Sequence, residues 1–146
     1  MILMKRSIVC VILLAACAAA KQPDTLAESI RGYNDGIRWG RYSIAATRIP
    51  EEERSKFADE MDARSEDLRI TDYEIIRVDQ VGKNEAKVQI KISWYLDSVQ
   101  TLRETHAMQT WERKAKTWLM VEEKRVRGAE MPGLPEPAAE AAITPR

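Results

Sequence analysis

The chain has little sulfur and little imidazole: two cysteines and one histidine occur among its 146 residues. A metal site built on cysteine or histidine therefore has almost no ligands available, and the sequence predicts neither a metal nor a cofactor. An excess of charge is also missing, because 23 basic residues balance 23 acidic ones. This balance excludes a strongly basic nucleic-acid binder and a strongly acidic tail protein.

A long hydrophobic run is absent as well. The apolar segment that begins at Ile8 is shorter than the about 20 residues that span a bilayer. It follows the basic pair Lys5 and Arg6 and ends in small residues. This pattern is typical of a secretory signal peptide, and we prefer it to the alternative of a buried core helix.

The end of this segment, Leu14-Ala15-Ala16-Cys17, resembles the lipobox of bacterial lipoprotein signal peptides. The resemblance implies cleavage before Cys17, a diacylglycerol on its sulfur and an acyl chain such as palmitate on its amine. Several acyl chains give stable membrane attachment. By similarity to enterobacterial sorting, Ala18 favours the outer membrane, with the domain facing the periplasm. The alternative is ordinary signal cleavage after Ala20.

These features divide the chain into four parts. Residues 1–16 form the predicted lipoprotein signal peptide and 17–24 a lipidated tether, which makes the membrane a partner through Cys17. Residues 25–127 form one domain. Residues 128–146 are rich in proline and alanine, and we expect them to be disordered or loosely held. Removal of 1–16 leaves Cys17 as the single cysteine, so no intramolecular disulfide can form.

The first half of the domain predicts helices. The segment from Thr25 to Glu28 matches a capping box, and apolar residues then recur on one helical face. Three glycines, Gly32, Gly36 and Gly40, lie four apart. They indicate either a groove for close helix approach or a turn at Gly40, and we favour the turn because each glycine inside a helix costs about 1 kcal/mol. Further helices are expected over 41–48 and from residue 50 onwards.

The second half predicts four strands, over 70–81, 86–96, 99–111 and 117–126. Short connections favour an antiparallel meander. Alternation is strict over 88–96, and three turn assignments agree on one apolar face. That face holds Tyr73, Ile75, Val88, Ile90, Ile92, Trp94, Leu96, Val99, Ala107, Trp111, Trp118 and Met120.

The expected fold is therefore α+β, with N-terminal helices packed on a long, curved, four-stranded antiparallel sheet. On the segments Tyr33–Tyr42, Ile92–Tyr95, Gln109–Glu112 and Thr117–Leu119, the chain resembles the nuclear transport factor 2-like superfamily. The resemblance covers about residues 24–127 and is strongest to bacterial lipoproteins of that superfamily. It implies a cone-shaped domain. That fold includes isomerases, dehydratases and non-catalytic binding modules, so it does not choose an activity.

Glu122 and Asp79 are candidates for a catalytic base. On the predicted register, both side chains face the inside of the cone, as does that of Arg77. A carboxyl group in an apolar pocket has a raised pKa and can accept a proton near neutral pH. The alternative, which we favour, is that Glu122 forms an ion pair at the rim of the sheet. We therefore assign no catalytic residue.

Aromatic and polar residues supply candidates for a ligand pocket, since such pockets are mostly apolar with a few polar groups. The candidates are Tyr33, Trp39, Tyr73, Trp94, Arg103, Gln109, Trp111 and Trp118. The alternative is that the aromatic residues simply fill the core, and we favour it.

We thus expect a lipid-anchored envelope protein whose domain binds a protein partner or a small apolar ligand without catalysis. The second hypothesis is a small isomerase or dehydratase that uses a carboxylate in the cone. The third is assembly, as a homodimer or with another envelope protein, through the outer face of the sheet. That face is interrupted by Ile76, Val78, Leu102, Met108, Leu119 and Val121. No nucleic-acid partner is expected.

Overall fold

The computed structural model describes residues 23–137, so the predicted signal peptide and Cys17 lie outside the described residues. The helical part consists of α1 (Leu26–Arg38), α2 (Tyr42–Ala46), a 3₁₀ turn (Glu51–Glu53) and α3 (Arg54–Arg64). The strands follow as β1 (Leu68–Val81), β2 (Glu85–Leu96), β3 (Arg103–Lys114) and β4 (Thr117–Gly128).

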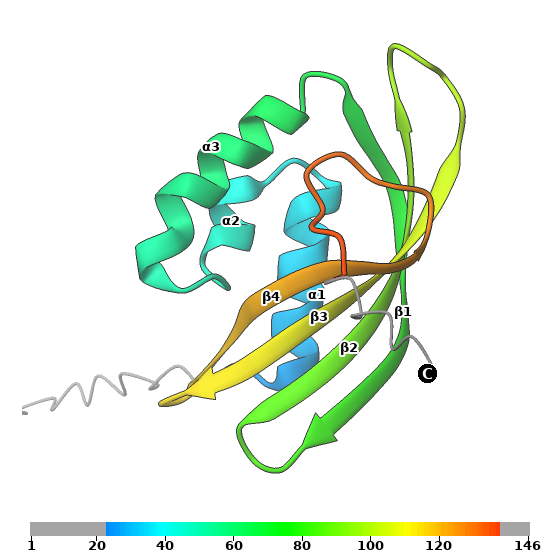
Figure 1. Ribbon diagram of the computed structural model, residues 1–146. Helices are drawn as coiled ribbons and strands as arrows, with labels where there is room; N and C mark the ends of the chain where they lie inside the picture. The colour runs from blue at the N-terminus through cyan, green and yellow to red at the C-terminus, as the bar shows by residue number, and fades with distance from the viewer. Residues whose placement is uncertain (1–22, 138–146) are drawn as a thin grey trace, which may run out of the picture.

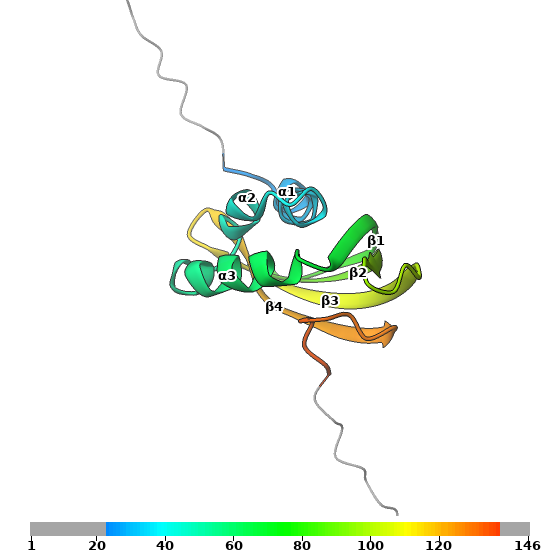
Figure 2. The ribbon, with the colours of Figure 1, turned by 90° about the horizontal axis from the view of Figure 1, so that it is seen from above.

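The four strands form one antiparallel sheet in the order β1-β2-β3-β4. The sheet is curved, and the helices lie on one side of it (Figures 1 and 2). We call the face toward the helices the concave face and the opposite one the outer face. The expectation of an α+β fold with a four-stranded antiparallel sheet is confirmed.

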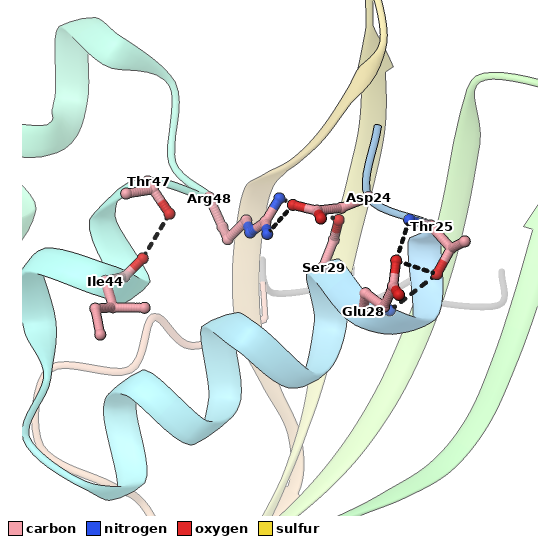
Figure 3. Close-up of polar contacts among 7 residues, drawn as sticks. All are labelled: Asp24, Thr25, Glu28, Ser29, Ile44, Thr47 and Arg48. Carbon is pink, nitrogen blue, oxygen red and sulfur yellow. Dashed lines mark hydrogen bonds and ion pairs between the residues drawn. The ribbon is translucent and has the colours of Figure 1, made fainter. Parts of the chain in front are cut away.

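Helix α1 begins at the predicted capping box. The amide of Glu28 donates to Thr25 Oγ1 at 3.2 Å, and the amide of Thr25 donates to Glu28 Oε2 at 2.7 Å. Beside this cap, the guanidinium of Arg48 binds the carboxylate of Asp24 and the hydroxyl of Ser29 (Figure 3). These side-chain contacts of Arg48 link the start of the domain to the segment that follows α2.

The spaced glycines have two different roles. Gly40 follows α1 with φ +66°, so the predicted turn is confirmed there. Gly36 lies inside α1, where an added Cβ would stand 2.9 Å from the Cβ and the amide nitrogen of Ala45. Gly36 therefore allows α1 and α2 to approach closely, and the groove reading holds at this position.

The core lies between the helices and the concave face. Its largest fully buried side chains include Trp94 and Trp111, with Ile30 from α1 packed in the same cluster. The predicted apolar face is confirmed except at Val99, which is 49% exposed because β3 begins only at Arg103. The loop between β2 and β3 is longer than expected.

The strand register differs from the prediction by two residues in several places. Trp111 pairs with Met120 instead of Trp118, and Tyr73 pairs with Ile92 instead of Trp94. Since side chains alternate between faces with a period of two, such a shift leaves each side chain on its predicted face.

Four bulges interrupt the pairing, and two of them bear on the candidate site. The pairing of β1 skips Thr71 and Ile76, and the pairing of β4 skips Val121 and Val126. Each extra residue moves the following side chains to the opposite face. The predicted faces are therefore wrong after Ile76 in β1 and between the two bulges of β4.

Residues 129–137, which we call the C-terminal strap, return to the sheet instead of forming a loose tail. Met131 and Leu134 are 7% and 6% exposed within the core cluster. The amide of Arg125 donates to the carbonyl of Pro135 at 2.8 Å, and its guanidinium binds Glu136. The expected tail is wrong for this segment, which pairs with the edge of β4. Residues 138–146 lie outside the described residues.

The outer face is largely charged. A cross-strand ion pair joins Lys91 to Glu74 at 2.9 Å, and along β4 the ammonium of Lys124 lies 3.6 Å from the carboxylate of Glu122. The predicted apolar stripe is not continuous, because Leu102 lies in the loop before β3 and Val78 pairs with buried Val88 on the concave face. A partner bound through this face stays a prediction.

Candidate functional site

A pocket of about 440 Å³ lies on the concave side, between α1, the end of α3 and the start of β1. About half of its wall is apolar, and this part is supplied by Ile37, Leu68, Ile70, Ile92, Met61 and Met131, whereas charged and polar side chains supply much of the rest. Its volume falls within the range of about 300–1,000 Å³ that is typical of small-molecule sites.

Glu123 is the carboxylate that the sheet contributes to this pocket, and Asp62 is the one from α3. Glu123 lies on β4 directly opposite Gln109 of β3, on the concave face, because the bulge at Val121 turns it inward. The side-chain amide of Gln109 donates to the Glu123 carboxylate and, at 2.9 Å, to Asn34 Oδ1. Gln109 thus fixes the position of the Glu123 carboxylate by a hydrogen bond from the neighbouring strand.

Gln109 is itself fully buried and completely bonded. Its carbonyl oxygen accepts from Trp111 Nε1 at 3.2 Å and from Asn34 Nδ2 at 3.3 Å. Asn34 also donates to the carbonyl of Ile30 at 2.8 Å within α1. A satisfied buried network of this kind fixes the orientation of its members, so Glu123 has a defined direction toward the pocket.

Burial raises the pKa of Glu123 above its usual value, because the charged carboxylate loses solvation there. The hydrogen bond from Gln109 and the positive charge of Arg64 oppose this effect without cancelling it. The pKa of Tyr33 is also raised, first by burial and then by the charge of Glu123. Both shifts have burial as their main cause, because burial disfavours the charged carboxylate and the charged phenolate.

Tyr33, Tyr42 and Tyr73 form the aromatic part of the wall. The ring of Tyr33 packs edge-on against Trp111, with centroids 6.0 Å apart, and it also contacts Phe57 of α3. The hydroxyl of Tyr73 donates to Asp35 Oδ1 at 2.8 Å. Partial burial and this hydrogen bond raise the pKa of Tyr73 to about 12.

A second pocket, of about 340 Å³, lies between α3, β4 and the C-terminal strap. Tyr33, Met61, Arg64 and Glu123 line both pockets. These four side chains therefore form the boundary between the two spaces.

The predicted pocket residues fall into two groups. Tyr33 and Tyr73 line the pocket, and Gln109 lies directly behind Glu123. The other candidates do not line it. They are Trp94, Trp111 and Trp118 in the core, and the exposed Trp39 and Arg103. For the three core tryptophans the favoured alternative, core packing, is the observed one.

The two exposed candidates have local partners. Trp39 is 61% exposed and carries the guanidinium of Arg38 at 4.7 Å from its ring centroid. Arg103 lies 5.9 Å from the ring centroid of Trp94. Neither residue reaches the pocket.

The two candidate bases face away from the cone, which corrects the prediction. Asp79 pairs with Arg77 at 2.7 Å on the outer face, because the bulge at Ile76 reverses both side chains. Glu122 is exposed and lies 3.6 Å from Lys124, because the bulge at Val121 exchanges it with Glu123. The Glu-Glu pair in the sequence was a signal for an inward carboxylate, but alternation alone assigned the wrong member.

No group of three or more histidine, cysteine, aspartate or glutamate side chains suited to a metal ion occurs in the part of the chain from 23 to 137. In the same range, no helix is long and apolar enough to cross a membrane.

No protein-family model and no curated protein sequence matches this chain. Its fold is similar to two solved structures. A SEC-C motif-containing protein from Rhodopseudomonas palustris aligns with a TM-score of 0.61 and 12% identity, over 73% of this chain and 83% of that one. A ketosteroid isomerase-like protein from Erwinia carotovora atroseptica aligns with a TM-score of 0.57 and 11% identity, over 68% and 92%.

These similarities concern the fold alone, since the identities are low. They show that the α+β arrangement of this chain also occurs in a SEC-C motif-containing protein and in a ketosteroid isomerase-like protein.

Proposed function

We propose that this protein is a lipid-anchored protein of the bacterial cell envelope whose cone-shaped domain binds a small, mainly apolar ligand in the concave pocket. The observation that carries the proposal is a pocket in which aliphatic side chains stand beside polar groups, among them Glu123, which Gln109 holds in a fixed position at the inner wall. Small-molecule sites combine an apolar lining with a few oriented polar groups in this way.

The pocket can enclose an apolar ligand between α1 and the sheet. Ile70 and Ile92 come from neighbouring strands and Ile37 from α1, so an apolar ligand would be enclosed from two layers of the fold. Burying apolar surface contributes about 25 cal/mol per Å². The carboxyl of Glu123 would then orient a hydrogen-bonding group of the ligand.

Analysis of co-purified small molecules tests this function. We compare the intact protein with Ile70→Trp, which fills the pocket, and with Ile76→Trp, which places the same side chain on the bulge outside it. Each protein is purified from membranes, extracted and analysed by mass spectrometry. A compound retained by the wild type and Ile76→Trp but lost from Ile70→Trp is expected. The same extract from all three proteins contradicts ligand binding in this pocket.

The proposed address depends on Leu14-Ala15-Ala16-Cys17. Cells are fed a fatty acid with a terminal alkyne, and the protein is recovered and coupled to a fluorescent azide. The wild type should be labelled and Cys17→Ala should not. Equal labelling of both, or none of either, contradicts the lipid anchor, whereas the domain fold is unaffected by either result.

A second candidate function is catalysis of proton transfer, as in an isomerase. The observation that favours it is a carboxyl group, Glu123, that lines a pocket and whose pKa is raised by burial, since a raised pKa makes a carboxylate a stronger base. An unconjugated ketosteroid is a suitable first substrate, because its conversion to the conjugated enone is followed by ultraviolet absorbance. Turnover that is lost in Glu123→Gln and kept in Glu122→Gln would favour the enzyme over the binding protein.

A further inference from the structure

Arg64 occupies a special position at the end of α3. Its side chain lines both pockets and is 20% exposed. A Cβ added to Gly133 of the C-terminal strap would overlap the guanidinium of Arg64, so this group packs directly on the strap backbone. The head of this side chain is thus held at the boundary between the two pockets.

The other two arginines of the pocket wall already have close partners. Arg38 lies 3.1 Å from the carboxylate of Asp72, and Arg69 lies 2.6 Å from that of Asp97. Arg69 also donates to the carbonyl of Ser65. Both guanidiniums are therefore fixed at the rim by the protein itself.

Arg64 differs from them in its bonding. Among residues 23–137, the carboxylate nearest to its guanidinium in an ion pair is that of Glu60, one helical turn earlier, at 3.8 Å. A guanidinium offers five N–H donors, and a pair at this distance leaves most of them for another acceptor. No completely buried polar side-chain atom in the described part lacks a partner, so any donor that Glu60 leaves unbonded is accessible to solvent or to a ligand.

Glu123 does not supply a close acceptor for the guanidinium of Arg64. Its carboxylate accepts from Gln109, and within the described residues no ion pair joins it to Arg64. Arg64 is therefore a largely enclosed cation that lines the concave pocket and that the protein bonds only loosely, so its guanidinium is available to an anionic ligand there. Enclosed charges of this kind are normally paired.

We propose that the ligand of this pocket is an amphipathic carboxylic acid, whose carboxylate binds the Arg64 guanidinium while its hydrocarbon body lies against Ile37, Ile70 and Ile92. The inference rests on the function proposed above and gives the ligand its chemical class. A carboxylate matches the planar fork of arginine with two parallel hydrogen bonds. A doubly charged phosphate fits less well, because Asp62 and Glu123 line the same pocket.

The test uses the intact protein in lipid nanodiscs and decanoate labelled with ¹³C at the carboxyl carbon. A saturable carboxyl signal that is absent from empty nanodiscs reports binding. Labelled decanol is the neutral comparison, and decyl phosphate is the dianionic one. The variants are Arg64→Met, Arg64→Lys and Arg31→Met, the last of which makes the same exchange at an exposed position of α1 outside the pocket.

We expect decanoate to bind more tightly than decanol and decyl phosphate. Arg64→Met should weaken decanoate at least about tenfold, the scale of a lost charge-assisted hydrogen bond. Arg64→Lys should fall between, and Arg31→Met should bind as the wild type does. Glu123→Gln, which keeps an acceptor for Gln109 and removes the negative charge, should bind decanoate at least as well.

Different failures have different meanings. Equal binding of decanol and decanoate, unchanged in Arg64→Met, overturns the carboxylate inference and leaves the proposed function standing. Tighter binding of decyl phosphate assigns a different head group and also overturns it. If none of the three ligands gives a saturable signal, the carboxylate inference fails, and the co-purification experiment decides separately on the proposed function.

Discussion

Replacing Glu123 with glutamine should change the pH dependence of folding stability. Burial raises the pKa of this carboxyl in the native state above its value in the unfolded chain. Between these two pKa values, the native protein keeps a proton that the unfolded protein has released. The free energy of unfolding therefore falls as the pH rises through this interval, and it is level below the unfolded value of about 4.3.

The size of the effect follows from proton linkage. One additional proton bound by the native state gives a slope of at most about 1.4 kcal/mol per pH unit. The side-chain carbonyl introduced by Glu123→Gln still accepts from Gln109, so near pH 4 this variant and the wild type should differ by no more than about 1 kcal/mol. Toward neutral pH, the variant should become progressively the more stable protein.

Urea unfolding followed by tryptophan fluorescence, from pH 4 to pH 8, measures this difference. Glu122→Gln is the matched control, since the neighbouring side chain is exposed on the outer face and its curve should run parallel to that of the wild type. Parallel curves for Glu123→Gln and the wild type would refute a raised pKa of the Glu123 carboxyl in the native state. A difference that grows toward acid pH would refute it as well.

Two further pairs of substitutions test the packing. Gly36→Ala should destabilise the protein by about 1–3 kcal/mol, because its Cβ would stand 2.9 Å from Ala45. At Gly32 the nearest atom lies 3.7 Å from an added Cβ, so Gly32→Ala should stabilise α1 by up to about 1 kcal/mol. Urea unfolding measures both changes. Leu134→Ala in the buried strap should lower the free energy of unfolding by about 2–5 kcal/mol. Leu102→Ala in the exposed loop should lower it by less than about 0.5 kcal/mol. Equal effects of the two substitutions would contradict the packing of the strap against the core.

The architecture could be predicted because its signals are local. The capping box at Thr25 and the alternation over 88–96 are each contained in a few neighbouring residues. Antiparallel pairing between successive strands then needs only short connections. Errors of two residues in the predicted register did not change the predicted core, since they left each side chain on the same face of the sheet.

The inward carboxylate could not be predicted, because it depends on bulges. Ile76 and Val121 look like ordinary strand residues in the sequence, and their insertion is decided by packing between strands. Each bulge moved one expected base, Asp79 or Glu122, to the outer face. A single extra residue thus changes the chemistry attributed to a pocket while the fold remains the same.

The C-terminal strap escaped prediction for another reason. Its proline-rich composition has no helical or strand periodicity, and its contribution comes from two side chains three positions apart, Met131 and Leu134. Short segments of this kind are recognised only when the surface that receives them is known.

The concave pocket is tested most directly by the methionine methyl groups. Met61 and Met131 line it, whereas Met108 lies on the opposite face of the sheet. During titration of the intact protein in nanodiscs with decanoate or decanol, the ¹³C-methyl signals of Met61 and Met131 should shift and saturate while that of Met108 stays in place. Shifts of equal size at Met108, or no saturable shift at Met61 and Met131 with either compound, would contradict a ligand site on the concave face.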